Sequence, residues 1–421
     1  MLKRKIVKKL NDWKADDARK SLIIEGPQQI GKTFVLRSFG YQNYKQVVNI
    51  NFNQYPYMKY LFEMDMELDA LILQMTLLIK GAKCIPYETL ILLEEIDLCP
   101  PAMKALIKFS SDPRYDVIAT RTMLSTLNNP EDVIVIRMHA LDFEEFLWAN
   151  NVSNVTIQEI KNNFLQRRPV PSDLHNYLLD MFRYYMAVGG MPKTVRTFLN
   201  TGTYESIRLS QRFINDVYLS DIVSRVELNK KSRAVEIFHS IPQQVRKGNK
   251  RFKYSEVAKN ASYRTHWDSI YYLYQMGWLF TIFKAGPLNL PLLDNHKDDN
   301  FKLCVRDNGC LVGQLDDGDV EYLYQPLVIQ KNILLENCVA ELLVKRGLRM
   351  FYSEDGQHRF LLAQNKDRKI GLCFDDSNSL RRMNKLVDKG LLDEAYDLIV
   401  EPLYKDRSGI HLPLYNLMFV E

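Results

Sequence analysis

The sequence has few cysteines, and they are not arranged as a metal site or a disulfide framework. It holds six in 421 residues, with no C-x-x-C pair and no histidine cluster near any of them. The two closest, Cys304 and Cys310, do not have the spacing that zinc sites use. We therefore expect reduced thiols.

Long apolar runs are missing too. The most apolar stretch, Leu68–Ile79, is too short to span a bilayer and contains Asp69 and Gln74. The N-terminus is basic but has no apolar segment typical of a secretory signal. We expect a cytoplasmic protein without a membrane partner.

Neither strong charge nor repetition marks the chain. The net charge is +5 with 46% hydrophobic residues, and there is no internal repeat or low-complexity tract. A mild charge permits nucleic-acid contact but does not require it, so a basic binding surface would have to be local. The length favours two or three folded domains.

What the sequence does have is a glycine-rich loop after an apolar run. The run SLII is followed by EGPQQIGKTF, in which Gly26, Gly31, Lys32 and Thr33 have the spacing of a P-loop. Glycines let the backbone approach phosphates, and the helix that begins at Lys32 presents its positive end. Lys32 would reach the β- and γ-phosphates of ATP, and the Thr33 hydroxyl would coordinate Mg²⁺. The predicted nucleotide-binding residues are Gly26, Pro27, Gln28, Gln29, Ile30, Gly31, Lys32, Thr33 and Phe34.

Two acids end the apolar strand TLILLEEID. Glu94 is the predicted Mg²⁺ ligand beside Thr33, and Glu95 is the predicted catalytic residue, with Lys32, because it would polarise the attacking water. The first acid at this place is usually Asp. The longer Glu94 would disturb a tight octahedral shell, which leaves Asp97 open as an alternative ligand.

The order of elements predicts an α/β fold. Strands over 21–24, 46–52, 89–97, 116–120 and 132–138 alternate with helices, including one long helix through 58–80. Such alternation implies a mostly parallel sheet covered on both faces. A helix over 1–20 precedes it, and Asp142 with Glu145 fits a capping box at the start of the next helix.

We expect four parts in the chain. Residues 1–150 would form the P-loop domain, 151–230 a helical domain, 231–285 a winged-helix-like domain, and 286–421 a small α/β domain. The order of strands in the first part suits the class of P-loop ATPases to which AAA+ proteins belong.

Five stretches together resemble a known family. They are GPQQIGKTF, LILLEEIDLCP, LDFEEFLWA, YMAVGGMPKTV and FKYSEVAKNASYR, and they are similar to prokaryotic AAA+-type ATPases that carry a C-terminal domain of unknown function. The resemblance covers nearly the whole chain and implies an ATPase core, a winged-helix region and a C-terminal unit like a restriction endonuclease.

The chain departs from that family at its sensor and finger positions. Thr120 or Thr122 is the predicted γ-phosphate sensor, although Arg121 stands between them. Where the family has an arginine finger, this chain has Glu131 and Asp132, so the finger is missing unless Arg121 or Arg137 substitutes. Losing such a cation costs a factor of about 10³–10⁵ in turnover.

It also departs in the nuclease-like unit. Arg359 stands in place of a metal-binding acid, while Cys373 and Asp375 replace a Glu and a Lys. A nuclease needs converging carboxylates, and Glu336 alone does not make a site. We therefore expect this unit to be catalytically inactive.

A basic stretch is the candidate DNA contact. RKGNKRFK places five cations ahead of a predicted recognition helix, where they could meet the phosphates of duplex DNA. They are Arg246, Lys247, Lys250, Arg251 and Lys253. A solvated loop or a contact with a neighbouring domain explains them equally simply.

Two functions remain open. The first is an ATP-binding, slowly ATP-hydrolysing switch, with Mg²⁺ as cofactor and ADP as product. The alternative is a scaffold that holds nucleotide for stability and recognises DNA or an unidentified protein, with negligible turnover.

Overall fold

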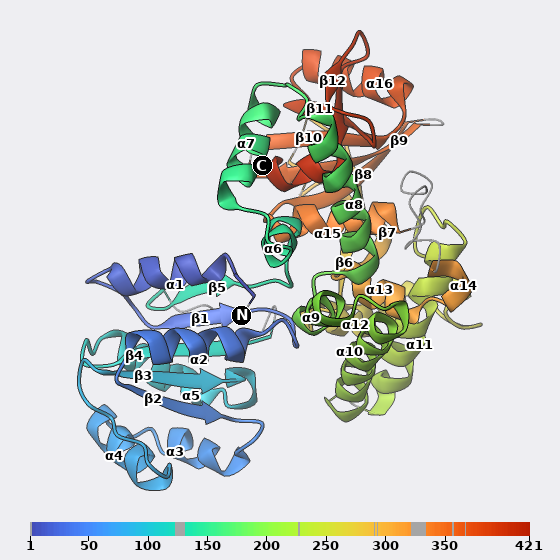
Figure 1. The fold of residues 1–421 in the computed structure, drawn as a ribbon. Coiled ribbons are helices and arrows are strands. Elements are labelled where there is room, and N and C mark those ends of the chain that lie inside the picture. The colour runs from blue at the N-terminus through green and yellow to red at the C-terminus, as the bar shows by residue number, and fades with distance from the viewer. Residues whose placement is uncertain are drawn as a thin grey trace. The chain divides into compact units, whose positions relative to one another are not determined.

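The computed structural model describes residues 2–122, 131–225, 228–289, 291–292, 294–320, 334–355, 358–366 and 368–421. They form two compact units, which are described separately. The N-terminal unit is mainly Arg4–Ala140, and the C-terminal unit is mainly Leu141–Tyr274 and Trp278–Glu421. The predicted α/β class is confirmed (Figure 1).

The N-terminal unit is built on a five-stranded sheet with the order β2-β3-β4-β1-β5. All four neighbouring pairs are parallel. The strands are β1 (Leu22–Glu25), β2 (Gln46–Asn51), β3 (Thr89–Glu94), β4 (Asp116–Arg121) and β5 (Ile134–Arg137). Every residue of β1 and β3 is buried, which explains why these strands read as unbroken apolar runs.

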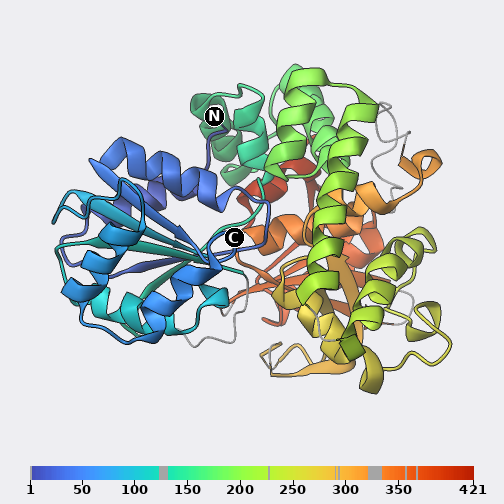
Figure 2. The same cartoon turned by 90° about the horizontal axis from the view of Figure 1, so that it is seen from below.

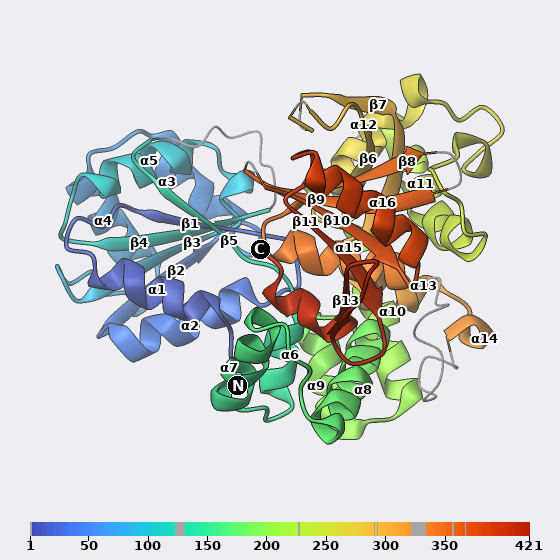
Figure 3. The same cartoon turned by 90° about the horizontal axis from the view of Figure 1, so that it is seen from above.

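Helices cover both faces of this sheet. Helices α1 (Ile6–Ala15) and α2 (Lys32–Asn43) lie on one side, with α3 (Tyr60–Glu63) and α5 (Pro101–Ser110) on the other (Figures 2 and 3). Helix α4 (Leu68–Leu78) and the 3₁₀ turns η1 (Pro56–Lys59) and η2 (Ile96–Leu98) complete the unit. Because the strands are parallel, their carboxyl ends and the loops that follow them meet at one edge.

The prediction of one long helix through 58–80 is wrong. The chain forms η1, α3 and α4, with a break between Glu63 and Leu68. Asp65 adopts a left-handed backbone there, with φ of 43°, and its carboxylate accepts from Lys108 at 3.0 Å. A non-glycine residue in that conformation ends a right-handed helix.

The C-terminal unit begins with helices. These are α6 (Phe143–Ala149), α7 (Asn154–Leu165), α8 (Ser172–Val188), α9 (Pro192–Thr201), α10 (Tyr204–Arg225), α11 (Leu228–Arg246) and α12 (Tyr263–Gln275), with the turn η3 (Tyr254–Glu256). The rest of the unit adds α13 (Asn308–Gln314), α14 (Asp317–Val320), α15 (Leu335–Lys345), α16 (Ser377–Asp388) and the turn η5 (Leu414–Phe419).

Its sheet is mixed, with the order β12-β13-β11-β10-β9-β8-β6-β7. The strands are β6 (Leu279–Ala285), β7 (His296–Val305), β8 (Arg349–Asp355), β9 (His358–Asn365), β10 (Arg368–Phe374), β11 (Glu394–Ile399), β12 (Tyr404–Lys405) and β13 (Ile410–Pro413). The antiparallel pair β6–β7 lies across the expected boundary at 285/286. The four-part division, with its winged-helix and nuclease-like parts, stays a prediction.

The capping box expected at Asp142 is confirmed. The Glu145 N–H donates to the Asp142 side chain at 2.9 Å, and the Asp142 N–H donates back to Glu145 at 3.4 Å. These bonds satisfy amide donors that have no partner inside helix α6.

We expect Asp142→Ala to destabilise α6, because it leaves the Glu145 N–H without its acceptor. The cost should be about 0.5–2 kcal/mol of local opening free energy, read as faster hydrogen exchange over residues 143–149. Asp173→Ala is the matched control, since Asp173 lies in the first turn of α8, whose N-cap makes no side-chain bond. Equal exchange over 143–149 in both variants would contradict the assignment.

Candidate functional site

The glycine-rich loop joins the end of β1 to the start of α2. The backbone is left-handed at Gln29, with φ of 61°, and at Gly31, with φ of 89°. Gly26 lies so close to the Met138 carbonyl oxygen that any Cβ would clash with it. The loop therefore makes a tight turn that delivers the N-terminus of α2, with its unpaired amide groups, to the edge where the strands end.

Lys32 lies across this loop. Its Nζ donates to the carbonyl oxygens of Gly26 at 2.6 Å and Pro27 at 2.7 Å. Burial lowers the pKa of Lys32 to about 8, although the nearby carboxylates, Glu95 first among them, act in the opposite direction. An anion held by the loop would compete with these carbonyls for the ammonium group.

Glu94, at the end of β3, is buried and in contact with several polar side chains. Its Oε2 accepts from the Thr33 hydroxyl at 2.6 Å and from Asn51 Nδ2 at 3.1 Å. Its Oε1 lies 3.4 Å from Arg37 Nη2 but has no hydrogen-bond partner. The two predicted metal ligands, Thr33 and Glu94, therefore lie in contact. The Oε1 atom of Glu94 can still accept a bond.

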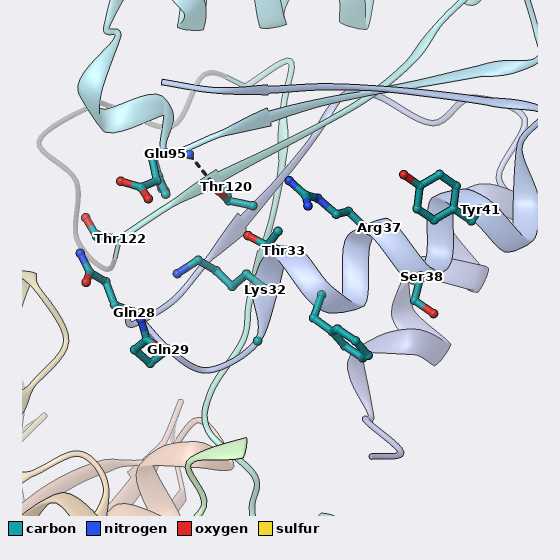
Figure 4. A pocket seen from close by; sticks show the side chains of 13 residues that line it. Gln28, Gln29, Lys32, Thr33, Arg37, Ser38, Tyr41, Glu95, Thr120 and Thr122 are labelled. Carbon is teal, nitrogen blue, oxygen red and sulfur yellow. Dashed lines mark hydrogen bonds between the residues drawn. The ribbon is translucent and has the colours of Figure 1, made fainter. Parts of the chain in front are cut away.

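Glu95 follows in a left-handed conformation, with φ of 59°. Its N–H donates to Thr120 Oγ1 at 3.0 Å (Figure 4). Thr122 donates to Asp97 Oδ2 through both its N–H, at 2.6 Å, and its hydroxyl, at 2.8 Å. The two predicted sensor threonines therefore hold the acidic segment after β3.

These groups surround a cavity of about 650 Å³. It is lined by Gln28, Gln29, Gly31, Lys32, Thr33, Phe34, Arg37, Ser38, Tyr41, Glu95, Thr120, Arg121 and Thr122 (Figure 4). Four residues of the predicted nucleotide and metal site do not line the cavity. Gly26, Pro27 and Ile30 shape the loop, and Glu94 contacts the lining residue Thr33.

Sequence reasoning missed Arg37, Ser38, Tyr41 and Asn51. The first three follow Phe34 at helical spacing, so one face of α2 runs along the cavity. That spacing could have revealed them once the loop was recognised. Asn51 comes from a different strand, and no sequence pattern places it beside Glu94.

The two arginines considered as substitutes for the missing finger share one carboxylate. Arg121 donates to Glu25 Oε2 through Nε at 3.0 Å and Nη2 at 2.7 Å, and Arg137 Nε donates to Oε1 at 3.0 Å. Arg121 and Glu25 are both 3% exposed. Both cations are therefore tied to the end of β1 in this structure.

Of the five predicted DNA contacts, three form ion pairs. Arg246 pairs with Asp316 at 2.5 Å, while Lys247 and Lys253 pair with Glu256 at 3.1 and 3.5 Å. These carboxylates reduce the local positive charge on which phosphate contact depends.

Within residues 286–421, the part predicted to be nuclease-like, two cations lie beside Glu336. Lys302 lies 2.6 Å and Arg359 3.4 Å from its carboxylate. The Cys373 thiol contacts Asp397 at 3.3 Å, and Asp375 has a left-handed backbone. Across the described residues, no group of three or more His, Cys, Asp and Glu side chains is placed to hold a metal ion.

Two family models match parts of the chain. Residues 18–147 match an AAA domain, and residues 179–319 match a domain of unknown function, DUF8612. The N-terminal region is therefore similar to AAA domains, as the resemblance implied, and a match to a domain of unknown function follows it. A comparison with curated proteins gave no match.

Several solved structures are similar in part. The Walker-type ATPase PABY2304 of Pyrococcus abyssi is 12% identical, over 75% of this chain and 96% of that one, with a TM-score of 0.42. Aeropyrum pernix ORC1 in complex with DNA is 12% identical over 76% and 90%, with a TM-score of 0.35. AMPPCP-bound DnaA from Aquifex aeolicus is 12% identical over 64% and 86%, with a TM-score of 0.28.

No helix in the described ranges combines the length and apolarity that a bilayer crossing needs.

The lowered pKa of Lys32 gives a pH prediction. A triphosphate favours the charged lysine, so ATP binding should be accompanied by proton uptake between pH 8 and the ordinary lysine value of 10.5. ATP affinity should fall as pH rises above 8. Calorimetric titration at pH 9, in buffers of different ionisation enthalpy, measures the uptake.

Lys32→Arg is the control, since arginine stays charged over this range. Proton uptake of the same size in the wild type and in this variant would contradict the assignment to Lys32.

Proposed function

We propose that the protein binds ATP with Mg²⁺ in the 650 Å³ cavity and hydrolyses the nucleotide slowly. One observation carries the proposal: the N-terminus of α2, the Lys32 ammonium group, Thr33 and Glu95 all line that cavity, and the Thr33 hydroxyl donates to Glu94. A helix N-terminus with a lysine provides the positive charge that phosphates need, and the acids provide for metal and water.

The site suits Mg²⁺. The Thr33 hydroxyl donates to Glu94 Oε2, and the buried Glu94 Oε1 has no hydrogen-bond partner, with Arg37 Nη2 3.4 Å away. Hard oxygen ligands from one or two side chains, completed by phosphate oxygens and water, are what Mg²⁺ prefers. A bound ion would supply charge neutralisation at the phosphates, and Thr33 with Glu94 would hold it.

Hydrolysis would then depend on Glu95. Its backbone is fixed by Thr120, so its carboxylate can serve as the acceptor for a proton from water. We propose that turnover is slow because Arg121 and Arg137 are bound to Glu25. Among the described residues that line the cavity, the other two cations are Lys32, which is bound to loop carbonyls, and Arg37, which lies 3.4 Å from Glu94.

A switch requires the loop to be linked to the rest of the chain, and Arg4 provides such a link inside the N-terminal unit. Its guanidinium donates to the Ile30 carbonyl at 2.9 Å and to the His139 carbonyl at 2.6 Å. The Met138 N–H also donates to the Glu25 carbonyl at 2.8 Å. The chain enters the C-terminal unit directly afterwards, at residue 141. A change in loop shape on nucleotide binding would therefore act on the connecting segment.

The alternative is a nucleotide-stabilised scaffold that binds DNA or protein with negligible turnover. Phosphate release measured with and without duplex DNA separates the two, since stimulated release supports the switch. Thermal stabilisation by ATP without release supports the scaffold.

We propose the cytoplasm as the compartment, in keeping with six free cysteines.

Two substitutions test the site. Lys32→Ala should weaken ATP binding about 10- to 100-fold, because it removes a charged hydrogen-bond donor. Glu95→Gln should leave ATP affinity unchanged and lower turnover by about 10²–10⁴. Calorimetric titration and phosphate release measure the two effects, and Glu63→Gln, an exposed change on α3, is the control. An unchanged affinity for ATP after Lys32→Ala would contradict the proposal.

Thr120→Val tests the placement of Glu95. Valine keeps the shape of threonine but removes the acceptor for the Glu95 N–H, so the carboxylate should shift. We expect turnover to fall by about 10- to 100-fold with little change in ATP affinity. Thr122→Val, which loses only the contact with Asp97, should have a smaller effect. Equal turnover in wild type and Thr120→Val would show that this bond does not position Glu95.

A further inference from the structure

Helix α4 is apolar on the side that faces solvent as well as on the side that faces the core. Its sequence, LDALILQMTLL, contains one charged residue. Leu71, Ile72 and Met75 are buried against the sheet and its helices, yet Leu73, Leu77 and Leu78 are 58%, 69% and 50% exposed. A helix that is apolar all round is normally buried on all sides, so the outer face of α4 lacks a partner within the described unit.

The exposed residues form an ordered stripe. Ala70, Leu73 and Leu77 are all exposed and follow one another at intervals of three and four residues, which places them along one face of the helix. Exposed Glu67 is the N-cap residue that precedes the helix, and exposed Lys80 lies two residues beyond the last residue of the helix. We call these five residues the α4 stripe. It carries a negative charge at one end and a positive charge at the other.

We propose that the α4 stripe docks against the α4 stripe of a second copy of this chain, with the two helices antiparallel. A two-fold axis near Leu73 brings small Ala70 opposite Leu77 of the second copy. The same axis brings Glu67 opposite Lys80 of the second copy, and the symmetry repeats both contacts. The stripe is thus complementary to itself in size and in charge.

That self-complementarity favours a second copy over other occupants. An anionic lipid surface would be repelled by Glu63 and Glu67, which are exposed around the start of α4. Asp65, also exposed, is paired with Lys108 at 3.0 Å. Asp69, which is also exposed, is paired with Arg114 at 2.7 Å and is not needed for the contact. Burying Leu73 and Leu77 from each copy removes apolar surface from water, which drives association.

Sedimentation of the full-length chain over a range of concentrations tests the proposal. The wild type should form a dimer that dissociates on dilution. Leu77→Lys should weaken dimerisation by at least about tenfold, because it places a charge opposite Ala70 of the other copy on each side of the two-fold axis. Leu209→Lys on α10 is the matched control, since Leu209 is 66% exposed, and it should leave the dimer unchanged.

A charge exchange tests the antiparallel arrangement. Lys80→Glu should weaken the dimer about fivefold by opposing Glu67 of the second copy, and adding Glu67→Lys should restore it. A monomer at every concentration, or a dimer unaffected by Leu77→Lys, would overturn the proposal. Flotation of a monomeric wild type with neutral phosphatidylcholine vesicles, lost in Leu77→Lys, would also overturn it and assign the stripe to lipid.

Discussion

The left-handed turn at Gln29 and Gly31 is the constraint on which the rest of the site depends. It reverses the chain between β1 and α2, so that the helix starts beside the ends of the parallel strands. Lys32 then lies within 2.6–2.7 Å of the Gly26 and Pro27 carbonyls, and Thr33 lies against Glu94. Without the turn, residues adjacent in sequence could not surround one cavity with groups from β3 and β4.

The same turn is connected to the segment that leads out of the N-terminal unit. Arg4 binds the Ile30 and His139 carbonyls together. In the C-terminal unit, the next part of that segment is fixed by other bonds, because the Leu141 carbonyl accepts from Tyr185 at 2.9 Å and from Lys345 at 3.1 Å. Burial raises the pKa of Glu341, the partner of Lys345, to about 7. Buried polar networks of this kind favour one discrete geometry over many.

Much of this architecture could be predicted from sequence, because local patterns carry it. The spacing of Gly26, Gly31 and Lys32 predicts the loop, and the apolar run before Glu94 predicts a buried strand. The break at Asp65 could not be predicted, since it depends on a left-handed residue held by distant Lys108. Two contacts could not be predicted either: that of Asn51 with Glu94, and the sharing of Glu25 by Arg121 and Arg137. In both, the order of the strands in the sheet brings together residues that are distant in sequence.

The most direct test of the central claim is a crystal structure with a non-hydrolysable ATP analogue and Mg²⁺. The account predicts that the triphosphate lies against the amides at the start of α2, with Lys32 Nζ moved from the Gly26 and Pro27 carbonyls to phosphate oxygens. Mg²⁺ should lie between Thr33 and Glu94. An analogue bound elsewhere, with Lys32 still on the two carbonyls, would contradict it.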